Sequence, residues 1–263
     1  MRQRTGEGLA MSRLQASGKL GIVFALSEEE HGFRQVLSQS QLLARRQEPQ
    51  DVWIVGNVEA SVEVSGLGRE RCAEATHRLI ERGAQWIVCA GFAAGLDEEL
   101  RLGDIVVADR VLLRDAGDAE PIACGESLAE AVPPSGTLGY AIRRSDLVTS
   151  DAAVYKSSEK NQIHLDTGAG ALDMESYGAA EVCRRRCVPF LAIRSISDTA
   201  GQDLCKEIEQ LVSMEGRLSR AGFVLSRPLL WKDILVLRGQ ARNAAKNLGD
   251  VLGIMLLRLI QAN

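Results

Sequence analysis

The sequence lacks a long apolar run, an excess of positive charge and a segment typical of secretion. Its longest apolar stretch, residues 251–260, is interrupted by Arg258 and falls short of the ~20 residues that a membrane-spanning helix needs. The first 18 residues contain no apolar core of a signal peptide, so we expect a cytoplasmic protein without a membrane span. A formal net charge of -4 and a pI near 5.6 give no electrostatic basis for binding nucleic acid.

Cysteine and histidine are also too scarce and too scattered to indicate a metal site. Among the six cysteines, Cys183 and Cys187 lie one helical turn apart, but no second ligand pair accompanies them. We therefore expect reduced thiols rather than a metal site or disulfides. None of the three histidines lies near a G-x-S-x-G segment, which argues against a serine hydrolase. Gly66 and Gly68 begin a G-x-G pattern, but residue 71 is Arg where a dinucleotide fingerprint needs glycine, so we predict no cofactor.

The sequence does contain short apolar runs that alternate with helical patterns, as in an α/β protein, and a 46% hydrophobic share that can form a large core. Apolar runs predict strands at residues 20–26, 51–56, 61–65, 84–91, 103–108, 147–151 and 188–193. Helical patterns follow the first strand and residue 65, and recur near residues 157–164, 174–187, 202–219 and 228–261. Residues 1–18 read as a disordered leader, and residues 115–145, which include Pro133 and Pro134, as a variable loop region.

Two polar segments lie where buried strands are expected to end. Asp173, Met174 and Glu175 precede a helix, and Arg194, with Asp198 four residues later, lies at the end of the apolar strand 190–193. In open α/β sheets, ligands bind outside the carboxyl ends of the strands. Two acids, a thioether and an arginine that converge there exceed what the fold requires. This convergence predicts a ligand site.

These segments, Asp173-Met-Glu-Ser and Arg194-Ser-Ile-Ser-Asp-Thr-Ala, resemble the signature of the purine nucleoside phosphorylase and nucleosidase superfamily. The segments 25–30 (Ala-Leu-Ser-Glu-Glu-Glu) and 90–107, which contains Ala-Gly-Phe-Ala-Ala-Gly-Leu, resemble the same family in the same order. Its nearest branches are the methylthioadenosine/S-adenosylhomocysteine nucleosidases and the hopanoid-associated phosphorylases. The resemblance covers roughly residues 20–200. It implies a three-layer α/β/α sandwich with a mixed, twisted central sheet.

The resemblance also implies an organisation. We expect a single domain from residue 19 to 263, with a helical C-terminal tail from about residue 203. Members of the family are usually dimers, trimers or hexamers, so we expect a homo-oligomer that binds a small purine nucleoside.

The resemblance assigns two catalytic residues. Glu29 aligns with a glutamate that helps to bind and deprotonate the attacking water, with Glu30 as the alternative if the alignment slips by one residue. Asp198 aligns with the acid that protonates N7 of the leaving purine, and the apolar Ile193 and Ile196 near it are expected to favour its protonated form. Each has a structural alternative, because acids at a helix start interact favourably with the helix dipole or cap the helix.

Five further residues are implied to bind the nucleoside or the nucleophile. Glu175 is expected to accept hydrogen bonds from the ribose hydroxyls, although an acid at a helix start has the same structural alternative. Met174 offers a polarisable surface beneath the ribose. Arg194 is expected to pair with a neighbouring carboxylate and to orient the nucleophile. Asp173 and Ser197 complete this group.

The segment 92–95 is expected to form a loop beside the ribose and the base. Its small residues Ala93 and Gly95 allow the backbone to approach a ligand closely. Relatives usually carry serine or threonine where Phe92 stands, so its ring either excludes solvent or reshapes the pocket.

Relatives place a base-stacking aromatic residue near position 153, which is alanine here. Val154 and Tyr155 are the neighbours that substitute for it in this interpretation, although Tyr155 as an ordinary half-buried residue explains the pattern equally well.

Water and phosphate remain open as the nucleophile. Because no arginine occurs between residues 21 and 33 to offset a phosphate beside Glu29, the sequence favours hydrolysis, as in the nucleosidases. Arg69 and Arg71, near the glycines at residues 66 and 68, are the candidates for a phosphate site, with inorganic phosphate as co-substrate. The long tail keeps a hopanoid-associated phosphorylase open as the alternative. A member that binds nucleosides without cleaving them is the alternative of another class, motivated by Phe92 and Ala153.

Overall fold

The computed structural model describes residues 18–39, 45–47, 51–115, 117, 119–204 and 231–261. The strands are β1 (Lys19–Phe24), β2 (Arg45–Gln47), β3 (Val52–Val55), β4 (Val58–Val64), β5 (Trp86–Gly95), β6 (Ile105–Leu113), β7 (Ile122–Ala123), β8 (Ile142–Thr149), β9 (Ala171–Asp173) and β10 (Phe190–Asp198). The helices are α2 (Ser27–Gln39), α3 (Arg69–Glu81), α4 (Glu126–Ala129), α5 (Ser157–Thr167), α6 (Ser176–Arg186) and α9 (Trp231–Gln261). The predicted leader and the predicted helix 202–219 fall almost entirely outside the described residues.

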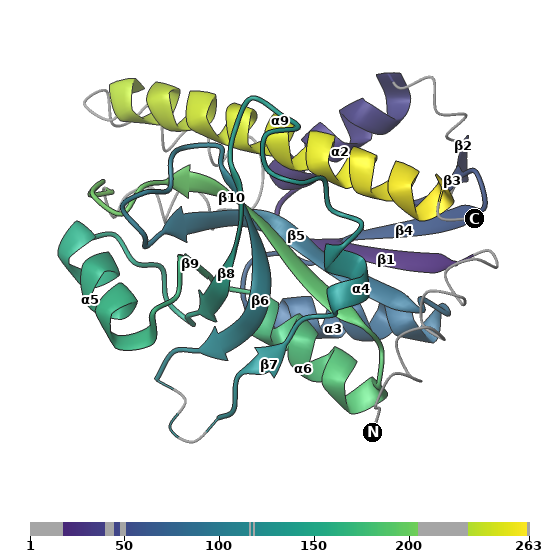
Figure 1. Ribbon diagram of the computed structural model, residues 1–263, viewed down its shortest axis with the longest axis horizontal. Coiled ribbons are helices and arrows are strands. Elements are labelled where there is room, and N and C mark those ends of the chain that lie inside the picture. The colour runs from purple at the N-terminus through teal and green to yellow at the C-terminus, as the bar shows by residue number, and fades with distance from the viewer. Residues whose placement is uncertain are drawn as a thin grey trace.

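The strands form one mixed sheet with helices on both faces, which confirms the predicted three-layer architecture (Figure 1). Strand β1 pairs in parallel with β4 and β5, and β10 pairs in parallel with β5, whereas β3 runs antiparallel to β4. Helices α2 and α9 cover one face, and α3 and α6 cover the other (Figure 1).

Part of the sheet closes on itself. Strand β10 pairs with both β5 and β6, and the path from β6 returns to β5 through β8 and β9. This closure brings the ends of β5, β9 and β10 together, although residues 95, 173 and 198 are far apart in the sequence. Pairing around a circle also leaves these strands without a free edge.

The alternation of apolar runs located most strands correctly. The uninterrupted run 190–193 forms the fully buried start of β10, as expected of a strand that is covered on both faces. The predicted turn at Asn57 lies between β3 and β4. In the C-terminal tail, Ala244, Ala245 and Leu248 are buried, so this part of α9 packs on the core.

Two predictions of irregular structure were wrong. Residues 92–95 are not a loop, because β5 continues through them and pairs with β10 and β9. Small residues permit this extension, since they allow β5 to be packed between neighbouring strands without a bulky side chain at each step. The region 115–145 is also not loop throughout, as it contains β7, α4 and the start of β8.

Candidate functional site

Arg194 lies in the middle of β10, which continues beyond the predicted strand end at residue 193, and it is the centre of a buried polar cluster. Its side chain is 1% exposed, and its Nη2 atom lies 2.6 Å from Asp173 Oδ2. The same nitrogen donates to Ser176 Oγ at 2.8 Å and to Cys89 Sγ at 3.1 Å. The pair with Asp173 is the carboxylate contact that the sequence predicted for Arg194. Its Nε and Nη1 atoms are buried and have no hydrogen-bond partner among the described residues, so part of the guanidinium is left to bind something else.

Asp173 is held firmly in place by the start of α6. Thr149 Oγ1 donates to Asp173 Oδ1 at 2.7 Å, and the backbone N–H of Ser176 donates to Oδ2 at 3.0 Å. Because both carboxylate oxygens are occupied by protein donors and Oδ2 also meets Arg194, Asp173 orients the arginine. A direct contact with a ligand is therefore not needed to explain why this residue is buried and acidic.

Glu29 lies on the first turn of α2 and is 3% exposed. Its Oε2 atom accepts from the backbone N–H groups of Ala25 at 2.8 Å and Leu26 at 2.9 Å, and its Oε1 atom accepts from Phe92 at 2.8 Å. Burial raises the pKa of Glu29, and the charge of Arg194 and these hydrogen bonds offset only part of that increase. A buried glutamate with a raised pKa is suited to accept a proton near neutral pH.

Gly91 separates Glu29 from Arg194. A Cβ atom at this position would lie 2.2 Å from Arg194 Nη1 and 2.8 Å from Glu29 Oε1. The two polar atoms therefore both pack against Gly91 and are at most about 5 Å apart. One water molecule is large enough to bridge such a gap between a donor and an acceptor. Only glycine allows both side chains to approach β5 this closely.

Glu30, the alternative to Glu29, has a different environment. Its Oε1 atom lies 2.6 Å from Arg34 Nη2, one turn later in α2, and Arg34 also pairs with Asp51. Glu30 therefore joins α2 to the segment before β3, whereas Glu29 faces the end of β10.

Glu175 is 5% exposed, and its side chain is hydrogen-bonded to the residue that precedes α3. The backbone N–H of Gly68 donates to its Oε1 atom at 3.0 Å, and the N–H of Met174 donates to Oε2 at 3.2 Å. Burial, followed by the nearby Asp173 carboxylate, raises the pKa of Glu175 to about 8. The glycine amide that the sequence offered as a cradle for an external anion is thus occupied by a carboxylate of the protein.

Asp198 does not have the apolar environment that the sequence predicted for it. It is 5% exposed and forms a buried ion pair with Lys160 of α5, and Ser197 Oγ donates to its Oδ1 atom at 2.7 Å. A bulge between Ile196 and Asp198 shifts the register with β5. Such bulges re-aim the side chains that follow, which fits the separate partners of Asp198 and Arg194. No helix begins among residues 199–204, so Asp198 does not cap one there.

The remaining predicted residues of β5 and β10 line the same end of the sheet. Phe92 is half-buried, Ala93 is buried and its carbonyl oxygen lies 3.3 Å from Ser197 Oγ, and Gly95 lies beside the Asp198 carbonyl. Met174 is half-buried between Asp173 and Glu175.

Val154 occupies a different environment from these residues. It is 4% exposed and belongs to an apolar cluster with Leu96, Leu172 and Ile163 of α5. Its packing therefore suffices to explain its apolar side chain, and its role in binding a base stays a prediction. Tyr155 and Ala153 are partly exposed beside it.

Of the two arginines proposed for phosphate, Arg69 directly follows Gly68, whose amide binds Glu175 of the cluster. Arg69 forms a two-pronged hydrogen bond with Asp151, at 3.0 Å and 3.2 Å. Arg71 is exposed and lies over Gly66. The sequence argument from residues 21–33 was incomplete, because Arg194 supplies a cation beside Glu29 from a distant strand.

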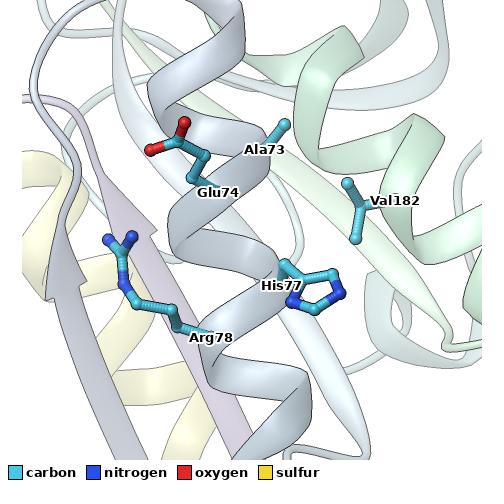
Figure 2. A pocket seen from close by; sticks show the side chains of 5 residues that line it. All are labelled: Ala73, Glu74, His77, Arg78 and Val182. Atoms are coloured by element: carbon cyan, nitrogen blue, oxygen red, sulfur yellow. The ribbon is translucent and has the colours of Figure 1, made fainter.

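A shallow hollow lies elsewhere, between α3 and α6 (Figure 2). Two of the polar residues that line it have ion-pair partners: His77 lies 3.4 Å from Glu81 and Arg78 lies 2.7 Å from Glu63. The third, Glu74, is exposed. The hollow contains no buried acid or nucleophile. The cluster around Arg194, rather than this hollow, is therefore the candidate site.

Other kinds of site find no support in the part of the chain that the structure describes. It contains no group of three or more His, Cys, Asp or Glu residues arranged to hold a metal ion. None of its helices combines the length and the apolarity needed to cross a membrane.

Sequence reasoning missed Lys160, Gly91 and Cys89. Of these, only Lys160 could have been recognised from the sequence. It lies three residues before Ile163 on the buried side of α5, where a lysine is unusual.

Comparison with known proteins agrees with the fold. A family model described as the Phosphorylase superfamily matches residues 19–221. The 5′-methylthioadenosine/S-adenosylhomocysteine nucleosidase of Mycobacterium bovis is 28% identical over 228 residues, which cover 70% of this chain and 87% of the relative. The nucleosidase of the same name from Tolumonas auensis is 30% identical over 177 residues, which cover 61% of this chain and 77% of the relative.

Solved structures extend this likeness along the chain. The crystal structure of the corresponding nucleosidase of Campylobacter jejuni has a TM-score of 0.67 at 21% identity, and the alignment covers 91% of this chain and 98% of that one. The futalosine hydrolase of Helicobacter pylori has a TM-score of 0.65 at 22% identity, with coverages of 91% and 97%. The predicted nucleoside phosphorylase type of fold is thereby confirmed.

Proposed function

Because this chain belongs to the phosphorylase superfamily, we propose that it cleaves the N-glycosidic bond of a purine nucleoside of the adenine type by hydrolysis. The observation that carries the proposal is the close approach of Glu29 Oε1 and the unpartnered Nη1 of Arg194, which both pack against Gly91. An acceptor and a donor that face each other at this distance suit a water molecule. Glu29 accepts its proton, and Arg194 orients its oxygen towards C1′ of the ribose.

The ribose and the base meet the remaining residues of the cluster. Glu175 accepts hydrogen bonds from the ribose hydroxyls while positive charge develops at C1′, and Met174 lies beneath the sugar. Asp198 provides the proton that the leaving base takes up at N7, and Ser197 fixes its carboxyl group through Oδ1. Phe92, Ala93, Gly95 and Val154 border the space for the base.

Hydrolysis is favoured over phosphorolysis by the charges of the site. Asp173 already pairs with the guanidinium of Arg194, so little of its positive charge is left to offset a phosphate dianion. The Gly68 amide is bound to Glu175, and Arg69 is bound to Asp151. Neither is free to hold phosphate.

The relatives guide the choice of substrates. Nucleosidases named for 5′-methylthioadenosine and S-adenosylhomocysteine are among them, and a futalosine hydrolase shares the fold. The test is base release from methylthioadenosine, S-adenosylhomocysteine, adenosine, inosine and futalosine, each with and without inorganic phosphate.

We expect adenine release from a 5′-thio-substituted adenosine in phosphate-free buffer, and no release by a Glu29→Gln variant. Strict dependence on phosphate would identify a phosphorylase instead. Tight binding of an adenosine in calorimetry without any base release would identify a binding protein.

A further inference from the structure

Lys160 is a fully buried lysine that the proposed reaction has not yet used. It lies on α5, and its side chain is 0% exposed. Its Nζ atom donates to Asp198 Oδ2, to the carbonyl oxygen of Thr199 at 2.9 Å and to that of Gln202 at 3.1 Å. A lysine ammonium has three N–H groups, so these three acceptors use all of its donors.

The choice of lysine at this position calls for an explanation. Removing an ammonium group from water is costly unless an opposite charge is close to it. The charged partner of Lys160 is Asp198, the residue assigned to protonate the base. With Lys160 at Oδ2 and Ser197 at Oδ1, both oxygens of this carboxyl group are fixed.

We propose that Lys160 is a positioning residue for Asp198 and that the two side chains protonate the leaving base as one acid unit. This inference rests on the proposed cleavage of a purine nucleoside. The pair of ammonium and carboxylate has the same total charge as an amine beside a neutral carboxyl group. In the proposed step, the proton that Asp198 passes to N7 comes from Lys160, so the step itself draws no proton from solvent.

The proton balance of the step is complete. Asp198 gives its proton to N7 as the C1′–N9 bond breaks, and the electron pair of that bond stays with the base. The oxygen of the water molecule forms the new bond to C1′, and Glu29 takes up a proton of that water. Lys160 regains a proton from solvent between turnovers, and Glu29 releases one.

The experiment compares two substrates in the Lys160→Met variant. One is an adenine nucleoside that the wild-type protein cleaves, and the other is its N7-methylated form, whose base leaves without taking up a proton at N7. We expect kcat on the unmodified nucleoside to fall about 100-fold or more, the usual effect of losing a general acid. On the N7-methylated nucleoside we expect a change of less than about threefold. Equal losses on both substrates, or no loss on either, would overturn the proposal.

Ile163→Ala is the matched control, because it removes a buried side chain from the same helix without touching the pair. Any effect of loosened packing should be equal on the two substrates. Failure of the wild-type protein to cleave either nucleoside would refute the proposed function itself, which distinguishes the two outcomes.

The double variant Lys160→Met/Asp198→Asn covers the case in which Lys160→Met alone does not fold, because it removes both buried charges together. If the pair acts as one unit, the double variant should be no slower on the unmodified nucleoside than Asp198→Asn. A further tenfold loss in the double variant would show that Lys160 acts independently of Asp198.

Discussion

The two buried cations of the site, Arg194 and Lys160, differ in how completely the protein uses them. Lys160 donates from all three N–H groups to Asp198 and two carbonyl oxygens. Arg194 binds Asp173 through Nη2, whereas its Nε and Nη1 atoms have no partner within the described part of the chain. A buried donor without a partner costs free energy. The lysine is therefore complete without a ligand, and the arginine is not.

This difference separates two tasks at one end of the sheet. The incomplete cation faces Glu29 across Gly91 and is suited to receive the nucleophile. The complete cation can act only through Asp198, on the side of the leaving base. The bulge before Asp198 fits this separation, since it alters the direction of the last side chain of β10 relative to Arg194.

The largest expected effect comes from replacing Asp198, the acid that pairs with Lys160. Asp198→Asn should lower purine release about 100- to 10,000-fold, because an amide has no proton to donate to N7. Release of base followed by absorbance, with folding checked by circular dichroism, measures the effect. Asp166→Asn, on the exposed face of α5, is the control. Activity of Asp198→Asn within a few fold of wild type would show that the acid is another residue.

A second variant displaces Arg194 from its contact with β5. Gly91→Ala places a Cβ atom 2.2 Å from Arg194 Nη1, so the guanidinium must shift away from Glu29. Misplacement of a nucleophile site by about 1 Å can cost about 100-fold in rate, and we expect a loss of kcat of that order. Gly139→Ala has no atom within 4 Å of the new Cβ and should leave the rate unchanged. Full activity of Gly91→Ala would place the nucleophile elsewhere.

The sequence predicts which residues belong to the site better than it predicts which residues they contact. Asp173, Glu175, Arg194 and Asp198 lie in two short segments at strand ends, so local patterns and a family resemblance suffice to find them. The partners come from elsewhere: Gly68 reaches Glu175 from a segment 107 residues away, and tertiary closure of the sheet alone brings them together.

Errors in the sequence argument had the same origin. Apolar neighbours in the chain predicted an apolar environment for Asp198, because nothing in residues 190–200 indicates a lysine from α5. The lack of an arginine near Glu29 in the sequence concealed the one that β10 supplies. The small residues 93–95 indicated a loop, yet they extend β5 because adjacent strands pack closely on both sides of them.

The raised pKa of Glu175, a buried carboxyl group near Arg194, predicts that stability depends on pH. The pKa of Glu175 is about 8 in the folded protein, above its ordinary value of 4.5, so the folded state holds a proton that the unfolded state releases. This contribution to stability is full below about pH 4.5 and is lost as the pH rises through about 8. Glu175→Gln, which cannot titrate, should therefore show a smaller fall in Tm between pH 5 and pH 8 than the wild type.

Thermal unfolding at several pH values tests this difference in slope. Glu70→Gln, an exposed change on α3, should follow the wild-type curve. Parallel curves for Glu175→Gln and the wild type would mean that Glu175 titrates alike in the folded and unfolded states.

The smallest effects concern the contact between α2 and α9, because α2 carries Glu29 whereas Lys160 lies on α5. Gly32 of α2 touches α9, and a Cβ atom there would lie 1.9 Å from the carbonyl oxygen of Ala245. Gly32→Ala should thus separate the helices and lower the free energy of unfolding by about 1–3 kcal/mol. Gly239→Ala, on the exposed side of α9 with no atom within 4 Å, should raise it by up to about 1 kcal/mol. Chemical denaturation measures both. Because α2 carries Glu29, Gly32→Ala should slow cleavage of the N7-methylated nucleoside as much as cleavage of the unmodified one. A selective loss on the unmodified nucleoside would contradict the separation of the two tasks.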